Sequence, residues 1–174
     1  RTDIYDWNGT QYILASTIWD EVTDPYYLML DAYTALKQGH PIRTIDFAEQ
    51  VLNFAEQDYE QLALDKDGIP VANIRAYAAG LAAIAYIQLG EPASAGVMLE
   101  PFTSLQGAHV PAVYAVQDFW TVYQQNGDLL AACEAMESRL IEGAAGLDES
   151  YESLFLDFLG YNMETIPNDA LCPL

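Results

Sequence analysis

The sequence predicts an all-α domain of antiparallel helix pairs, preceded by a short β-hairpin. Residues 71–102 form two apolar segments on either side of Gly90, and the first is rich in alanine and nearly free of charge. Such a helix is typically buried on most of its surface. Turn glycines recur in one register at Gly39, Gly90 and Gly127. An Asn-Gly dipeptide near the N-terminus separates two alternating runs, which favours a hairpin.

The composition fits one ordered, acidic domain. The chain has 174 residues, of which 52% are hydrophobic, enough to bury roughly 70% of the unfolded surface. It has 26 acidic and 6 basic residues and a net charge of −20. Such a charge repels phosphates and anionic lipids, so we expect no nucleic-acid partner. No apolar run reaches the roughly 18 residues of a spanning helix, so we expect no membrane insertion.

The hairpin is expected within residues 1–20, where residues 3–17 alternate around Asn-Gly. A lone hairpin is marginal in water. We therefore expect Trp7, Tyr12 and Ile13 to pack on the helices or on a sheet upstream.

The same stretch resembles the closing strand pair of VCBS or FG-GAP-type β-propeller repeats, through Ile4-Tyr5, Trp7-Asn8-Gly9 and Tyr12. The resemblance covers about a dozen residues and implies a propeller-like region before Arg1. A start on Arg1 within a strand also indicates a processed or longer protein. Scarce lysine with frequent tyrosine and aspartate is typical of exported bacterial proteins. We expect an extracellular or cell-surface location, with a cytoplasmic one as the alternative.

Prolines, glycines and capping residues divide the remainder into helices. Asp24-Pro25 begins the first helix, Gly39 ends it, and Pro101 is expected to end the fourth. The expected helices are residues 25–38, residues 42–62, two helices within 71–102, one from Pro111 to the Gly127 turn, residues 129–141 and residues 149–159. The helical domain spans residues 24–160, and residues 161–174 form an irregular tail.

The three turn glycines share a register of neighbouring residues. A tyrosine stands thirteen residues before each, small or aromatic residues stand seven and four before, and a small residue stands five after. These spacings place apolar side chains on facing helix stripes. Thirteen residues before the glycines stand Tyr26, Tyr77 and Tyr114, and seven before stand Ala32, Ala83 and Trp120. Four before stand Ala35, Tyr86 and Tyr123, and five after stand Thr44, Ala95 and Ala132.

Two of these runs, Ala32-x-x-Ala35-x-x-x-Gly39 and Ala83-x-x-Tyr86-x-x-x-Gly90-x-x-x-x-Ala95, resemble the signature of tetratricopeptide repeats. The likeness spans residues 25–142 and implies a right-handed solenoid of about seven helices, capped by the last. The glycine spacings of 51 and 37 residues depart from a period of about 34, and Trp120 fills a slot usually held by a small residue. We expect a distorted solenoid, with an irregular helical bundle as the alternative.

In that family the first helix of each pair lines a concave face, which implies a binding groove on this chain. Tyrosine suits a peptide or glycan surface because it combines apolar area with a hydroxyl group. The alternative is that these side chains pack between the helix pairs. The implied groove residues are Tyr26, Met29, Tyr33, Tyr77, Gly80, Ile84, Tyr114, Gln117 and Thr121.

The residues provide little for catalysis, a metal or a cofactor, and we expect none of the three. The only histidines, His40 and His109, stand beside helix starts or turns. Acid pairs such as Asp46 with Glu49 are typical of a solvated helix face. The run Asp65-x-Asp67-Gly68 lacks the distal glutamate of a calcium loop and favours a plain turn.

The two cysteines, Cys133 and Cys172, lack metal-binding spacing. In an exported protein they would form a disulfide that pins the tail, and in a cytoplasmic one they would be small apolar residues.

Together these observations predict a non-enzymatic domain of a larger exported bacterial protein. It would present a tyrosine-lined surface to a protein or peptide, preferably a basic one. The alternatives are a structural spacer next to a propeller, and a carbohydrate-binding or glycan-processing module with a buried acid pair.

Overall fold

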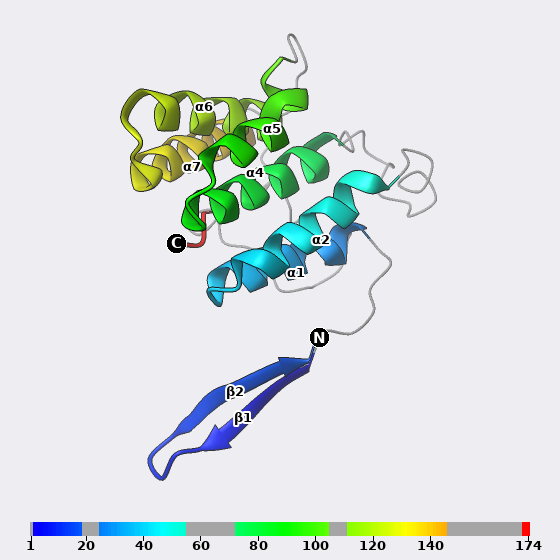
Figure 1. Cartoon of the computed structure of the whole chain (residues 1–174), viewed down its shortest axis with the longest axis vertical. Coiled ribbons are helices and arrows are strands. Elements are labelled where there is room, and N and C mark those ends of the chain that lie inside the picture. Colours follow the sequence, from blue (N-terminus) through cyan, green and yellow to red (C-terminus); the bar gives the residue numbers. More distant parts are fainter. Residues whose placement is uncertain (1, 19–24, 55–71, 105–110, 146–171) are drawn as a thin grey trace.

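The computed structural model describes residues 2–18, 25–54, 72–104, 111–145 and 172–174. Its described part is mostly helical, with six helices and an N-terminal antiparallel hairpin (Figure 1), as predicted. The predicted helix at 149–159 lies outside the described residues. The strands are β1 (Thr2–Trp7) and β2 (Tyr12–Ile18), and the helices are α1 (Pro25–Lys37), α2 (Pro41–Asn53), α4 (Ala72–Gln88), α5 (Pro92–Thr103), α6 (Pro111–Asn126) and α7 (Leu129–Ala145).

Trp7 and Tyr12 face each other across the ladder, and the four residues between them form the hairpin turn. Gly9 has a φ of 101°, in the region that favours glycine. The Asn8 side-chain oxygen accepts hydrogen bonds at 2.9 Å from the backbone N–H groups of both Thr10 and Gln11. The asparagine side chain therefore closes the turn from within.

The hairpin projects from the helical body in Figure 1. Of the two packing partners expected for Trp7, Tyr12 and Ile13, the helices are wrong, because all three side chains are exposed. Trp7 and Tyr12 pack on each other instead, with ring centroids 5.2 Å apart. The hairpin reaches the helices at its base, where the Thr17 hydroxyl lies 2.8 Å from an Asp3 oxygen and 3.4 Å from a Gln38 oxygen.

Each helix packs on the elements next to it in the chain. Helices α1 and α2 pack together, α4 packs on both, α5 packs on α4, α6 packs on α4 and α5, and α7 packs on α6. Figure 1 shows this succession from α1 to α7. Residues 76–85 of α4 are all buried, which confirms the prediction that the alanine-rich helix is buried on most of its surface. None of the described helices is long and apolar enough to cross a bilayer.

The turns at Gly39 and Gly90 have one geometry. The glycines have φ values of 75° and 80°. In both turns the glycine N–H donates to the carbonyl three residues back, and the next N–H donates to the carbonyl five residues back, all at 2.9 Å. His40 and Glu91 follow with φ values of −110° and −114°, and a proline then begins the next helix. Two separate stretches of sequence thus encode the same helix ending and helix start.

The small residues predicted on the second helix of each pair are buried. Thr44, Ala95 and Ala132 are fully inaccessible, which lets the paired helices approach closely. Trp120, the large residue in a small-residue slot, is accommodated by a glycine across the interface. A Cβ atom added to Gly96 of α5 would lie 2.9 Å from the Trp120 ring.

Three predicted helix ends are wrong. Helix α2 ends at Asn53, not at residue 62, because Phe54 turns extended with a ψ of 135°. Pro101 lies inside α5, which continues to Thr103, since a proline in the last turn removes only one hydrogen bond. Helix α7 runs four residues past the predicted end at residue 141.

Candidate functional site

The groove residues predicted on the first two helix pairs are core residues. Met29, Tyr33, Tyr77 and Ile84 are all buried, and Tyr77 is 1% exposed. A Cβ atom on Gly80 would lie 3.0 Å from a Val116 methyl carbon. The expected open concave face is therefore wrong at these positions, because α1, α4 and α6 pack too closely there.

The remaining predicted residues are spread over different environments. Tyr114 is half-buried, and the Gln117 side chain donates a hydrogen bond of 2.8 Å to the Phe102 carbonyl. Thr121 is exposed and lines a shallow hollow between α6 and α7, beside an ion pair between Asp118 and Arg139. The side chain of Tyr26 lies outside the described residues. The described members of the predicted set do not share one open surface.

Burial has an electrostatic consequence for Tyr77. Desolvation raises the pKa of its phenol well above the ordinary value of 10.0, and the neighbouring Tyr33 and Glu137 raise it further. Below about pH 10 the phenol is protonated in both the folded and the unfolded chain. Above that pH the unfolded chain releases a proton that the folded chain retains. The free energy of unfolding should therefore fall by up to about 1.4 kcal/mol per pH unit through this residue.

The Tyr77→Phe variant should lose that part of the alkaline slope, because phenylalanine has no proton to release. Urea unfolding at several pH values between about 9 and 11 measures it for both proteins. Parallel curves for the variant and the parent would show that Tyr77 is not desolvated.

An open groove of about 550 Å³ lies where α2 and α5 flank α4. We call it the α2–α5 groove. Its wall is mostly apolar, with an acid at one position and a guanidinium group at another. The lining residues are Glu49, Leu52, Arg75, Tyr86, Ala93, Ser94, Val97, Met98, Pro101 and Phe102.

One part of the groove is acidic. The Tyr86 hydroxyl donates to a Glu49 carboxylate oxygen at 3.4 Å. Partial burial raises the pKa of Tyr86, and the negative charges of Glu49, Glu91 and Asp46 raise it further. The phenol is therefore protonated at neutral pH, and the charges of Glu49, Glu91 and Asp46 make its surroundings negative.

Arg75 stands eleven residues before Tyr86 on α4, about 16 Å away along the helix axis. Its Nη2 atom donates to the Leu52 carbonyl at 3.2 Å, and its Nε is buried without a hydrogen-bond partner among the described atoms. Arg75 thereby secures the C-terminal end of α2 against α4.

The groove lining contains carboxylate, phenol, hydroxyl and guanidinium groups, and no histidine or cysteine is among its residues. In the described part of the chain, no three His, Cys, Asp or Glu side chains lie close enough to hold a metal ion. His109 and the Asp65 and Asp67 pair lie outside the described residues.

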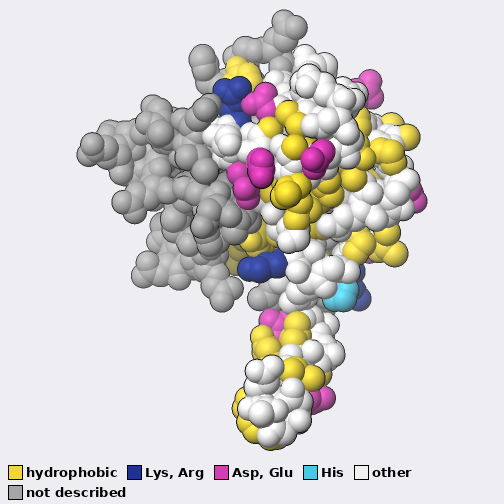
Figure 2. Space-filling model, turned by 90° about the vertical axis from the view of Figure 1, so that its left-hand side faces the viewer, with side chains coloured by type: hydrophobic (Ala, Val, Ile, Leu, Met, Phe, Trp, Pro, Cys, Tyr) yellow, Lys and Arg dark blue, Asp and Glu magenta, His cyan; other side chains and the backbone are white. Residues whose placement is uncertain are grey.

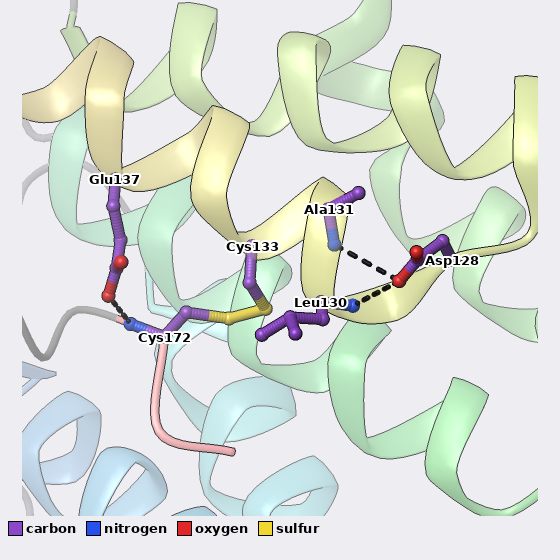
Figure 3. Close-up of a disulfide and its surroundings, with 6 residues drawn as sticks. All are labelled: Asp128, Leu130, Ala131, Cys133, Glu137 and Cys172. Atoms are coloured by element: carbon purple, nitrogen blue, oxygen red, sulfur yellow. Dashed lines mark hydrogen bonds between the residues drawn. A yellow bond between two sulfur atoms is a disulfide. The ribbon is translucent and has the colours of Figure 1, made fainter.

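The C-terminus is attached to α7 by a disulfide between Cys133 and Cys172 (Figure 3). The Cys172 N–H also donates to a Glu137 carboxylate oxygen at 2.9 Å. At the start of α7, one Asp128 oxygen accepts from the N–H groups of Leu130 and Ala131 at 3.0 and 3.1 Å. The last residues are thus held against a capped helix. Of the predicted tail, the structure describes residues 172–174.

The groove has a partial signal in the sequence. The register predicts Tyr86 on a facing helix stripe, and the spacing of Asp46 and Glu49 predicts a solvated helix face. The stretch of α5 has a single charged residue, Glu100, although Val97 and Pro101 are exposed. A surface helix with so little charge is the signal that points to an interface.

These features define the protein as a helical domain with an exposed hairpin and a mostly apolar groove that is acidic where Glu49 meets Tyr86. Comparisons with known protein families, with curated proteins and with solved structures find no match.

Proposed function

We propose that this protein is a non-enzymatic, tetratricopeptide-like domain that binds a basic and partly apolar segment of a partner protein in the α2–α5 groove. The observation that carries the proposal is the pairing of Glu49 with Tyr86 beside exposed apolar side chains of α5. An aromatic ring next to a carboxylate suits a lysine or arginine side chain.

The packing of the helices supports the repeat assignment. In a solenoid each pair contacts only its neighbours, and α4 packs on both helices of the first pair while α6 packs on both helices of the second. The shared geometry of the Gly39 and Gly90 turns supports it independently. We propose a right-handed solenoid of helix pairs. The groove is formed by α2, the second helix of the first pair, together with α4 and α5, the two helices of the next pair.

The electrostatics favour a cationic ligand. Glu49 accepts one hydrogen bond from Tyr86, which leaves further lone pairs for a ligand N–H group. Asp46 and Glu91 add negative potential at the same place. The net charge of −20 attracts basic partners from a distance and makes their association sensitive to salt.

The apolar wall of the groove favours a ligand that also carries an apolar residue. Val97 is 72% exposed, although it lies on a helix whose other side is buried. Met98 and Phe102 of the same helix also line the groove. A flexible methionine adapts to differently shaped apolar side chains. The groove therefore fits a segment in which lysine or arginine stands next to a large apolar residue.

We further propose that the domain belongs to an exported protein. The disulfide between Cys133 and Cys172 supports this, because such bonds persist in oxidising compartments.

The test is binding of labelled twelve-residue peptides that carry a Lys-Leu or Arg-Phe pair, measured by fluorescence anisotropy. Glu49→Lys should weaken binding at least about tenfold, because it replaces attraction by repulsion at the ligand cation. Glu134→Lys makes the same change in net charge on an exposed site of α7, and it should weaken binding less than about twofold.

Three results would contradict the proposal. They are equal losses for Glu49→Lys and Glu134→Lys, equal binding of peptides with glutamate in place of lysine, and no binding of any peptide in the set.

A further inference from the structure

The hairpin exposes an unusual amount of apolar surface. Cross-strand partners lie on one face of a ladder, so the pairs Tyr5 with Leu14 and Trp7 with Tyr12 form one continuous patch. We call these four residues the aromatic face. Their exposed fractions lie between 41% and 70%. Hydrophobic side chains are visible along the hairpin in Figure 2.

The opposite face is apolar as well. Ile4, Ile13 and Ile18 are exposed there, between 40% and 53%. A two-stranded hairpin with both faces in water is marginal, and contiguous apolar patches on a protein surface mark interaction sites.

The two edges of the hairpin differ in regularity. Strand β2 has a register shift, because Ile4 pairs with Ser16 while Tyr5 pairs with Leu14, which leaves Ala15 as an extra residue. Such a bulge bends the strand and disturbs its outer edge. Strand β1 has no extra residue over Thr2–Trp7. It is therefore the better template for another strand.

The charges of the hairpin favour a basic partner strand. Residues 2–18 contain Asp3 and Asp6, both in β1, and no basic residue. Asp3 lies on the same face as Tyr5 and Trp7, and Asp6 lies on the other. We propose that β1 is a docking edge for an extended strand of a partner protein, with lysine or arginine opposite the two aspartates and apolar residues opposite Tyr5 and Trp7.

A second copy of this chain fits the edge less well. Antiparallel pairing of two β1 edges would bring the aspartates of one copy close to those of the other, which is destabilising. The net charge of −20 per chain adds to the repulsion.

This docking edge is separate from the α2–α5 groove, and its test is read from the β1 amides alone. The probe is a blocked ten-residue peptide with the central sequence Ile-Lys-Val-Val-Lys-Thr, added to the full chain. Binding should protect outward-facing amides of β1 from hydrogen exchange, as measured by NMR. Asp6→Asn should weaken binding at the hairpin, read from the protection of the β1 amides, about two- to fivefold, whereas Glu134→Lys on the exposed surface of α7 should leave that protection unchanged.

A matched peptide isolates the backbone contribution. N-methyl groups on the amides that face β1 keep every side chain but block the ladder, so affinity should fall at least about tenfold. The proposal is overturned if the methylated peptide or a glutamate-for-lysine peptide protects β1 equally well, or if no β1 amide is protected. It is also overturned if the chain without peptide sediments as a dimer and its β1 amides are already protected.

Discussion

Replacement of Tyr77 by alanine should lower the free energy of unfolding by about 3–5 kcal/mol, as expected for truncation of a fully buried aromatic residue. Tyr77 lies in the middle of α4, is 1% exposed, and belongs to the core that joins all helix pairs. The variant leaves a cavity that this close-packed centre cannot easily fill. Urea unfolding followed by circular dichroism measures the change.

Tyr114 provides the matched control, because it occupies the same register thirteen residues before its turn glycine but is half-buried. Tyr114→Ala should cost roughly 1–2 kcal/mol. Equal losses in the two variants would show that burial does not distinguish these tyrosines. A loss below about 0.5 kcal/mol for Tyr77→Ala would place that side chain on a surface.

Loss of the disulfide should lower the free energy of unfolding by about 3–4 kcal/mol, through the entropy that the unfolded chain regains. The bond joins residues separated by 39 positions, so it closes a long loop in the unfolded state. The double variant Cys133→Ala with Cys172→Ala removes it without adding a polar group at the buried Cys133.

The parent protein with and without a reducing agent provides the control. The reduced parent and the double variant should unfold at similar urea concentrations, well below the oxidised parent. If the reducing agent does not change the midpoint of the parent, the bond contributes nothing to stability.

The helix pairs could be predicted from sequence because their signals are local. Glycines that need a positive φ and prolines that begin helices fix the turns at Gly39 and Gly90 without reference to the rest of the chain. The burial of α4 was also predictable, since a long alanine-rich segment has no polar face to expose.

Exposure of the recurrent tyrosines could not be predicted in the same way. Tyr77 and Tyr114 have equivalent places in the register, yet one is buried and the other is half-buried. The difference depends on which elements cover each helix, and the register contains no information on that. Tyr86 is a similar case, because its role beside Glu49 depends on α2 lying next to α4.

The groove escaped prediction because its parts are distant in sequence. Glu49 and Val97 belong to different helix pairs and line one groove only because the pairs stack. For the hairpin, the local structure was predicted correctly but its packing partner was not. Its turn and strands follow from local signals, but the expectation that its aromatic residues pack on the helices assumed a contact that the fold does not make.

The most direct test of the binding proposal is an NMR titration of the isotope-labelled chain with the lysine-containing peptide. The α2–α5 groove predicts that chemical-shift changes concentrate at Glu49, Tyr86, Val97 and Met98. It also predicts that they shrink as salt is raised, because the contact at Glu49 is electrostatic. Changes centred on Tyr114 and Thr121, with the groove signals unmoved, would contradict binding in the groove. They would instead place the binding site on α6, at residues that the sequence predicts as groove residues.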